Sequence, residues 1–251
     1  IVHSVIYNPK TNRATGARVI DSETLETREY FAKMIFLCAS TLGTTQILLN
    51  STSESFPTGI ANSSGVLGHY LMDHLYGAGA SGFIEGFEDE YYSGRRPTEL
   101  IMPRFRNYNE KTEDFLRGYM MKVGATREGW KSVTERDGIG TDYKNAIKAA
   151  GMWRMTMSGS GEMLPRFENQ VSLHPTLKDR WGIPQLLIDC SYSDNDMKML
   201  HDIADTAENM LETIGVKQVK KYIGELDDRK PGLTIHEMGT ARMGKDPKTS
   251  V

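Results

Sequence analysis

The chain has 251 residues, of which 39% are hydrophobic and 25% are charged, and this length and composition suit one large or two small folded domains. Its 30 basic and 33 acidic side chains give a net charge of −3, so the chain has no positive field that would hold nucleic acid. The longest apolar run, Met34 to Ala39, is far shorter than the roughly 20 residues that cross a bilayer. Two cysteines, Cys38 and Cys190, are too few for a disulfide framework. We therefore expect a soluble globular chain without a membrane span and without a nucleic-acid partner.

Both ends of the sequence look cut. The chain opens at Ile1 directly on a strand-like run, with no signal peptide, and it closes at Val251 without a final helix or polar tail. We therefore expect a piece of a longer polypeptide. Because a leader on the parent would not be visible, both a cytoplasmic and a periplasmic location are compatible with the sequence.

The first fifty residues predict strands followed by a helix. Turn-forming residues at positions 8–12 separate two strand-like runs, so residues 1–37 are expected to be rich in β-structure. The unbroken apolar run Met34 to Ala39 predicts a strand that is buried on both faces, as in a parallel sheet. Ser40 or Thr41 is then expected to cap a helix. A strand, a turn and a helix in this order are typical of nucleotide-binding α/β folds, and one such unit is present.

The middle of the chain predicts strands that are separated by polar, glycine-rich connections. The expected strands lie at Leu100–Met102, Tyr119–Val123, Met152–Met157 and Leu186–Ile188, and a short helix is expected at Thr141–Ala150. The clearest helix spans Asn195 to Ile214, because its apolar side chains recur every three or four residues. Ser193 or Asp194 would cap this helix and Gly215 would end it, and a last strand is predicted over Lys217–Ile223.

Gly77 to Gly82 match the dinucleotide-binding pattern G-x-G-x-x-G letter for letter, but the surrounding sequence favours a strand. The pattern binds a phosphate only where a helix opens directly after the glycines, so that backbone amides face the ligand. Residues 83–86 give no helix signal. We therefore predict a glycine-rich strand with a bulge or a close backbone approach.

The histidines do not form a recognisable metal-binding pattern. The sequence has six of them, but His236-Glu237 lacks the second histidine four residues on that a helical zinc site needs. His201-Asp202 lies in the long predicted helix and is interpreted as a surface pair. A serine hydrolase is equally disfavoured, because Ser158 to Gly161 only approximate the G-x-S-x-G turn. We predict no metal site.

The densest group of chemically useful residues lies between Gly232 and Pro247. The glycines of this segment let the backbone pass close to a flat ligand or to a neighbouring chain. His236 supplies a titratable base and Arg242 a fixed cation. From these residues alone, a glycine-rich turn with a solvated histidine is an equally good interpretation.

This segment resembles the glucose–methanol–choline (GMC) family of flavin-dependent oxidoreductases. His236 to Pro247 are similar to that family's H-x-x-G-T-x-R-M-G-x-D-P segment. Three further stretches agree in the family's order: residues 36–51 resemble its strand-to-helix segment ending in L-L-x-S, residues 64–74 its G-x-x-G-x-x-L-M-D-H segment, and residues 168–173 with 179–184 its E-N-x-V-x-L and D-x-W-G-x-P pair. Arg95-Arg96-Pro97 and Pro103-Arg104-Phe105-Arg106 look more like the sugar-oxidising bacterial members than like the cholesterol or aryl-alcohol branches.

The resemblance implies an α+β fold with two kinds of domain. One is a substrate-binding domain, in which helices cover an antiparallel or mixed sheet, and it is joined to part of a Rossmann-like FAD-binding domain. Residues 1–75 would belong to the FAD-binding domain and residues 76–235 to the substrate-binding domain. Residues 236–251 would form an active-site loop that returns to the FAD-binding domain.

The resemblance also implies a reaction, which is the FAD-dependent oxidation of a CH–OH group in an alcohol or sugar. In the family, the histidine of H-x-x-G-T takes the hydroxyl proton while hydride leaves for the flavin, and this role carries over to His236. The residues expected near the flavin are Ala39, Ser40, Asp73, His74, Gly239 and Gly244. A helix cap at Ala39–Ser40 and a surface turn at Asp73–His74 are the plain structural alternatives. Glu162 is a candidate on the substrate side, and its alternative is an ion pair with Arg166.

Two departures from the family bear on what this chain does by itself. The family's N-terminal G-x-G-x-x-G and the second His or Asn that follows its histidine are both absent from the chain. We therefore expect the chain alone to be inactive and its parent to be the oxidoreductase, with a small-molecule substrate and an electron-acceptor protein as candidate partners. The alternative function is a cofactor-free carbohydrate-binding or interaction module.

Overall fold

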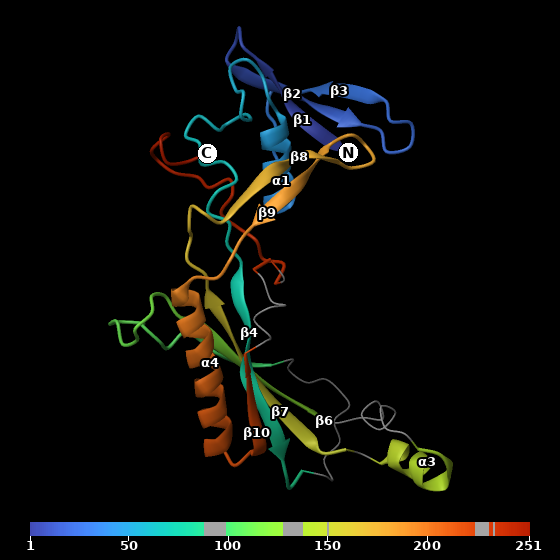
Figure 1. The fold of residues 1–251 in the computed structure, drawn as a ribbon, viewed down its shortest axis with the longest axis vertical. Helices are drawn as coiled ribbons and strands as arrows, with labels where there is room; N and C mark the ends of the chain where they lie inside the picture. The colour runs from blue at the N-terminus through green and yellow to red at the C-terminus, as the bar shows by residue number, and fades with distance from the viewer. Residues whose placement is uncertain (88–98, 128–137, 150, 224–230, 233) are drawn as a thin grey trace. The chain divides into compact units, whose positions relative to one another are not determined.

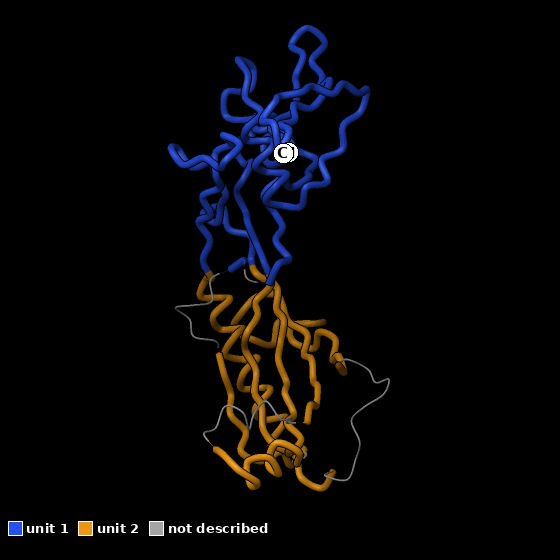
Figure 2. The backbone as a smooth tube through the Cα atoms, turned by 90° about the vertical axis from the view of Figure 1, so that its right-hand side faces the viewer, with its two compact units in different colours: residues 1–73, 164–191, 231–251 blue, residues 74–163, 192–230 orange. Residues whose placement is uncertain are grey.

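The computed structural model describes residues 1–87, 99–127, 138–149, 151–223, 231–232 and 234–251 (Figure 1). The segment Arg95-Arg96-Pro97 lies outside the described residues. The chain divides into two compact units, which Figure 2 colours separately. Unit 1 comprises Ile1–Asp73, Leu164–Ser191 and Pro231–Val251, and unit 2 comprises His74–Met163 and Tyr192–Lys230.

Unit 1 combines two small antiparallel sheets with one helix. The first sheet is a meander in the order β1-β2-β3, formed by β1 (Val2–Asn8), β2 (Arg13–Ile20) and β3 (Thr27–Phe31), and the second pairs β8 (Gln170–Lys178) with β9 (Pro184–Asp189). Helix α1 (Ser40–Asn50) packs against β1 and β8, and its Ile47 is buried there. The predicted β-rich start of the chain is therefore confirmed, because its turn residues close a hairpin between β1 and β2.

Unit 2 is a five-stranded antiparallel sheet with one long helix packed against it (Figure 1). The strand order is β10-β4-β7-β6-β5, with β4 (His74–Ile84), β5 (Leu100–Met102), β6 (Tyr119–Arg127), β7 (Trp153–Glu162) and β10 (Lys217–Ile223). Helix α4 (Asp194–Thr213) contacts β4, β6, β7 and β10, and the short α3 (Gly140–Lys148) has no buried residues. All the pairings are antiparallel, so the predicted α+β class is confirmed.

Helix α4 can approach the sheet closely because two glycines of β7 lie beneath it. A Cβ on Gly159 would come within 2.6 Å of the Ile203 side chain, and one on Gly161 within 2.5 Å of the Met199 sulfur. Met199 and Ile203 are fully buried at this contact. The helix begins as predicted at Ser193, whose hydroxyl accepts a hydrogen bond from the Asp196 N–H while the Asp196 carboxylate accepts one from the Ser193 N–H.

The glycine-rich run at residues 77–82 lies inside β4, so the predicted strand with an irregular register is confirmed. Its pairing with β7 shifts between Leu75 and Ala78. Gly79 has no room for a side chain, because a Cβ there would lie 2.2 Å from the Met157 carbonyl oxygen. The glycines therefore serve strand packing, and this run is no phosphate-binding turn.

The predicted buried strand at Met34–Ala39 is wrong. Residues 32–38 form no strand, and the side chains of Met34 and Phe36 are 70% and 77% exposed. Within the described part of the chain no strand pairs with residues 32–38, so their backbone groups have no neighbouring strand with which to form sheet hydrogen bonds.

The predicted capping of α1 is also wrong. Ala39 occupies the N-cap position, and no side chain caps the helix. Ser40 is the first residue of the helix and has a φ of 60°, and the Thr41 hydroxyl donates to the carbonyl oxygen of Glu237, 2.6 Å away. With Ala39 at the N-cap, Ser40 and Thr41 lie inside the first turn, so neither side chain occupies the capping position.

The second unit does not contain all of the predicted 76–235 domain. Residues 164–191 pack in unit 1. They are held there in part by a backbone hydrogen bond, in which the Val171 N–H donates to the Gly68 carbonyl oxygen over 2.8 Å. A Cβ on Gly68 would lie 2.2 Å from the Val171 carbonyl oxygen, so this approach requires glycine. Among the helices of the described residues, none is long and apolar enough to cross a membrane.

Candidate active site

The segment that leads to His236 is held by a single buried carboxylate. Asp73 is 3% exposed, and its Oδ2 accepts hydrogen bonds from the N–H groups of Gly232 and Thr234, both at 3.0 Å. Its Oδ1 accepts from the Thr234 hydroxyl and from the His236 N–H at 3.3 Å. A buried carboxylate is stable only when donors surround it, and this segment supplies them. The side chain of His236 itself is exposed.

Ile235, which lies between the hydrogen-bonded residues Thr234 and His236, adopts a backbone conformation that is unfavourable for isoleucine. Ile235 has φ 58°, in the left-handed region, although its Cβ is branched. The side chain of Ile235 is 79% exposed, so burial of that side chain does not hold it there. The flanking N–H groups of Thr234 and His236 both donate to Asp73, and these bonds hold the strained residue in place.

The residues after His236 are anchored to the first turns of α1. The Thr41 hydroxyl donates to the Glu237 carbonyl, as described above, and the hydroxyls of Thr45 and Thr240 lie 2.6 Å apart with both residues fully buried. The sequence contained no signal for these contacts, because threonines inside a helix are ordinarily neutral or unfavourable. They place the beginning of α1, including Ala39 and Ser40, against residues 237–240.

Gly239 is required by the packing of the chain on itself. Its φ is 106°, and a Cβ at this position would lie 1.9 Å from the Tyr70 carbonyl oxygen. Next to it, Met72 and Met238 exchange backbone hydrogen bonds of 2.9 and 3.0 Å, which hold the two segments side by side. The contact with Tyr70 alone therefore explains why position 239 is a glycine, without the predicted close passage of a flat ligand.

Gly244 has a similar local explanation, since a Cβ there would lie 2.8 Å from the Cβ of Ser250. Arg242 between these glycines lies over the ring of Tyr70, with 3.8 Å from Cζ to the ring centroid. Tyr70 in turn meets the edge of Phe167, which stacks on His69 at 3.8 Å. The cation predicted at Arg242 thus belongs to a cluster that links three segments of unit 1.

Helix α1 presents backbone donors next to this loop. Ala39 and Ser40 are exposed, and no side chain caps the first turn of the helix. The N–H groups at the start of a helix favour a partner with acceptor atoms or negative charge. Unit 1 therefore brings Ala39, Ser40, Asp73, His236 and Gly239 together.

The remaining predicted residues, His74 and Glu162, belong to unit 2. They are register partners on β4 and β7. Glu162 pairs with Arg104 at 3.2 Å and lies 4.0 Å from Arg117. The expected alternative partner, Arg166, pairs instead with Glu168 at 3.7 Å, so that ion pair was wrongly predicted.

Asp202 is not the surface residue that the sequence predicts. Its carboxylate accepts hydrogen bonds from the hydroxyl of Tyr119 at 2.5 Å and from the guanidinium of Arg106 at 3.0 Å. Burial, followed by the hydrogen bond to Asp202, raises the pKa of Tyr119 to about 12. Arg106, expected as a sugar-type residue, is therefore part of the link between β6 and α4.

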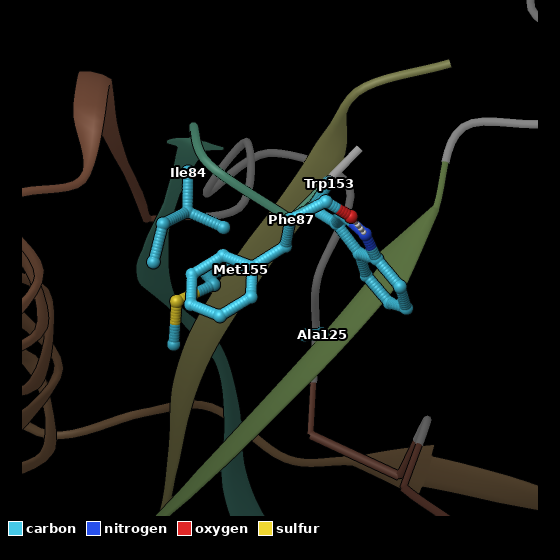
Figure 3. Close-up of a pocket in the computed structure, with 5 residues that line it drawn as sticks. All are labelled: Ile84, Phe87, Ala125, Trp153 and Met155. Carbon is cyan, nitrogen blue, oxygen red and sulfur yellow. Dashed lines mark hydrogen bonds between the residues drawn. The ribbon is translucent and has the colours of Figure 1, made fainter. Parts of the chain in front are cut away.

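An apolar cavity lies elsewhere in unit 2. It has a volume of about 250 Å³ and is lined by Ile84, Phe87, Ala125, Trp153 and Met155 (Figure 3). The indole N–H of Trp153 donates to the Phe87 carbonyl over 2.7 Å. No side chain of this lining can exchange a proton near neutral pH, so the cavity is not a candidate for the chemistry of His236. Within the described ranges, no group of three or more His, Cys, Asp or Glu side chains could hold a metal ion.

Residues 165–251, which include His236 and its anchors after position 231, match the family model described as GMC oxidoreductase. The resemblance of the chain to GMC oxidoreductases is therefore supported by this part of the sequence.

Curated relatives extend the similarity to the rest of the chain. It is 29% identical to a 2-methyl-1,2-propanediol dehydrogenase of Mycolicibacterium austroafricanum, over 96% of this chain and 44% of that protein. It is 24% identical to the fructose dehydrogenase large subunit of Gluconobacter japonicus, over 100% of this chain and 45% of that protein. A gluconate 2-dehydrogenase flavoprotein of Pantoea cypripedii is 28% identical over 44% of this chain and 18% of its own length. The chain thus spans less than half the length of each of these relatives.

Proposed function

We propose that the protein containing this chain oxidises a CH–OH group of an alcohol or sugar, with FAD as hydride acceptor and His236 as base. The observation that carries the proposal is an exposed imidazole on a backbone that Asp73, α1 and the Tyr70–Met72 segment hold from three sides. A base that is held in place and open to a ligand is what proton abstraction requires. The three relatives support the substrate class, since their names specify a diol, a sugar and a sugar acid.

The residues around His236 fit a flavin. The first turn of α1 offers N–H donors at Ala39 and Ser40, without a competing side-chain cap. Ile235 and Met238, at 79% and 43% exposure, offer apolar surface for a flat ring system. We include Gly239 and Gly244 in this cofactor surface. When bound, FAD supplies the two-electron oxidising chemistry that no side chain possesses.

In this proposal the chain's own residues orient the substrate and move the proton. His236 takes the proton from the substrate hydroxyl, so that the oxygen's electron pair forms the C=O bond while the carbon's hydrogen leaves as hydride. Glu162, on β7 of unit 2, is the residue that we propose for the substrate side, and His74 stays among the residues that we propose for the cofactor.

The same proposal assigns the parts of the chain. Residues 1–75 and 236–251 would form part of a Rossmann-like FAD-binding domain, and residues 76–235 would contain the substrate-binding sheet. The chain alone would then be inactive, and an electron-acceptor protein is proposed as a partner of the whole protein.

The first experiment is a visible absorption spectrum of the full-length protein, before and after anaerobic addition of simple alcohols and sugars. A flavin spectrum that one class of substrate bleaches is the expected result. A colourless protein that does not take up FAD would contradict the proposal and would favour a carbohydrate-binding or interaction module.

His236→Ala tests the base directly. We expect the variant to retain flavin and to be reduced by substrate about 100-fold or more slowly, because general-base catalysis contributes on this order. His201→Ala, which removes an exposed histidine of α4, is the matched control and should be reduced at the normal rate. Normal reduction of His236→Ala would remove His236 from the role of base.

A further inference from the structure

We propose that Asp73 is a positioning residue for His236 and that it does not contact the cofactor. Asp73 was expected beside the flavin, but both of its carboxylate oxygens are directed at the chain itself. Oδ2 accepts from the N–H groups of Gly232 and Thr234, and Oδ1 accepts from the Thr234 hydroxyl and the His236 N–H. An ionised carboxylate has about four acceptor positions, so these four donors fill its capacity. At 3% exposure, Asp73 also has almost no surface on which a ligand could bind.

Only a carboxylate can accept this set of bonds. Asparagine has the same shape, but it has one acceptor oxygen and an NH2 group that is itself a donor. An amide at position 73 would therefore direct N–H groups toward the N–H groups of Gly232 and Thr234, or toward the hydroxyl and N–H at Oδ1. Either orientation leaves backbone donors in a buried place without an acceptor.

The bonds to Asp73 also decide the direction of the histidine. Ile235 lies between two of the N–H groups that Asp73 binds, and it has a φ of 58° that a β-branched residue adopts only under constraint. Without the carboxylate, Ile235 relaxes toward negative φ. Because that rotation lies directly before His236, it turns the imidazole away from its present position, while the anchors at Glu237, Met238 and Thr240 remain.

The consequence for catalysis rests on the proposed function. If His236 is the base, Asp73→Asn leaves the imidazole present but correctly placed for only a small fraction of the time. Misplacement of a catalytic group lowers the rate of the chemical step more than it weakens substrate binding. We therefore expect kcat to fall roughly 10- to 100-fold with little change in KM, and flavin content to stay normal.

The decisive measurement is hydrogen–deuterium exchange of the peptide 231–238 in the full-length protein, both with its flavin and after removal of the flavin. In Asp73→Asn, either the N–H of Thr234 or that of His236 loses its acceptor, depending on the orientation of the amide, so exchange in this peptide should become about tenfold faster or more in both states. Asp196→Asn is the matched control, because Asp196 is also a fully buried aspartate that accepts backbone and hydroxyl bonds, but at the start of α4. It should leave the exchange of peptide 231–238 unchanged.

Variants at Thr234 keep the test valid if Asp73→Asn does not fold. Thr234→Val removes one of the four donors with little change in shape and should speed exchange of the same peptide, whereas Thr234→Ser retains the hydroxyl and should restore the wild-type rate. Unchanged exchange in Asp73→Asn without flavin, together with lost flavin affinity, would overturn the proposal and make Asp73 a cofactor ligand.

The two proposals fail separately. If the protein binds no flavin and oxidises nothing, the proposed function is wrong, but the exchange data still decide whether Asp73 holds the segment before His236. If the flavin is reduced normally in Asp73→Asn while the exchange accelerates, the positioning role of Asp73 in catalysis is wrong and the proposed function stands.

Discussion

At the scale of single residues, the backbone around His236 is shaped by close approaches and by strain. Gly239 passes so near the Tyr70 carbonyl that it excludes any side chain, and Ile235 adopts a left-handed φ. Such features persist only where surrounding bonds over-determine the conformation, and they gather at functional sites. The donors and acceptors of Asp73, Thr41 and Met72 provide those bonds here.

Gly239→Ala should destabilise the protein by more than about 2 kcal/mol, because a Cβ would meet the Tyr70 carbonyl in addition to the penalty of positive φ. The control is Gly65→Ala, at φ 74° with nothing within 4 Å of its Cβ, which should lose only about 1 kcal/mol. Denaturant unfolding of both variants gives the comparison. Equal losses would show that the approach to Tyr70 relaxes freely.

Ile235→Asn should raise the free energy of unfolding by about 1 kcal/mol, since asparagine tolerates the left-handed region far better than a β-branched residue. Little apolar burial is lost, because Ile235 is 79% exposed. Ile235→Val keeps the branched Cβ and should leave the stability unchanged. A variant with asparagine that is no more stable than wild type would mean that no strain is stored at this position.

At the scale of elements, a buried polar link joins β6 to α4. Tyr119 on the strand donates to Asp202 on the helix, and Arg106 reaches the same carboxylate and the hydroxyl of Thr206. Tyr119 is 2% exposed, so its hydroxyl must remain protonated and hydrogen-bonded to be stable there. The link therefore makes the packing of α4 sensitive to alkaline pH.

The pH dependence follows from the raised pKa of Tyr119, about 12 against an ordinary 10.0. The folded state holds this proton more tightly than the unfolded state, so the contribution is complete below pH 10 and is lost as the pH rises toward 12. We expect the stability difference between wild type and Tyr119→Phe to shrink by up to about 2 kcal/mol across that interval. Denaturant unfolding at several pH values measures it. Tyr108→Phe, which removes a tyrosine that is 74% exposed, should leave the profile unchanged.

At the scale of the whole molecule, unit 1 presents large apolar side chains to the surroundings. Met34, Phe36 and Met243 are 70%, 77% and 95% exposed. Exposed apolar side chains favour association with another surface, and a net charge of only −3 provides little repulsion between copies.

The 251-residue chain by itself should therefore self-associate, increasingly so as salt is raised. The double variant Met34→Lys with Phe36→Ser should shift it toward monomer, because it removes the most exposed apolar part of residues 32–38. Light scattering after size-exclusion chromatography measures the mass. Thr24→Lys is the control, because it adds the same charge at an exposed polar position. If this variant shifts equally far toward monomer, the effect of the double variant comes from its charge and not from the loss of apolar surface.

Much of the secondary structure could be predicted because its causes are local. The apolar period of α4 and the capping residue Ser193 lie within one stretch of chain, and the structure confirms both. The strands β5 and β10 have the predicted bounds, since β5 is a short apolar run and β10 begins soon after Gly215 ends α4. The strand nature of residues 77–82 was also predictable, because a helix signal was missing after the glycines.

What the sequence by itself determined, then, is the class of fold, the position of most elements and the segment around His236 as the place of interest. Only the tertiary structure decided why that segment has its shape. Asp73 meets His236 across 163 positions of sequence, and Thr41 meets Glu237 across 196. The tertiary structure also decided that Met34 and Phe36 in residues 32–38 are exposed. A strand forms only beside a neighbouring strand, and an apolar run in the sequence does not show whether such a neighbour exists.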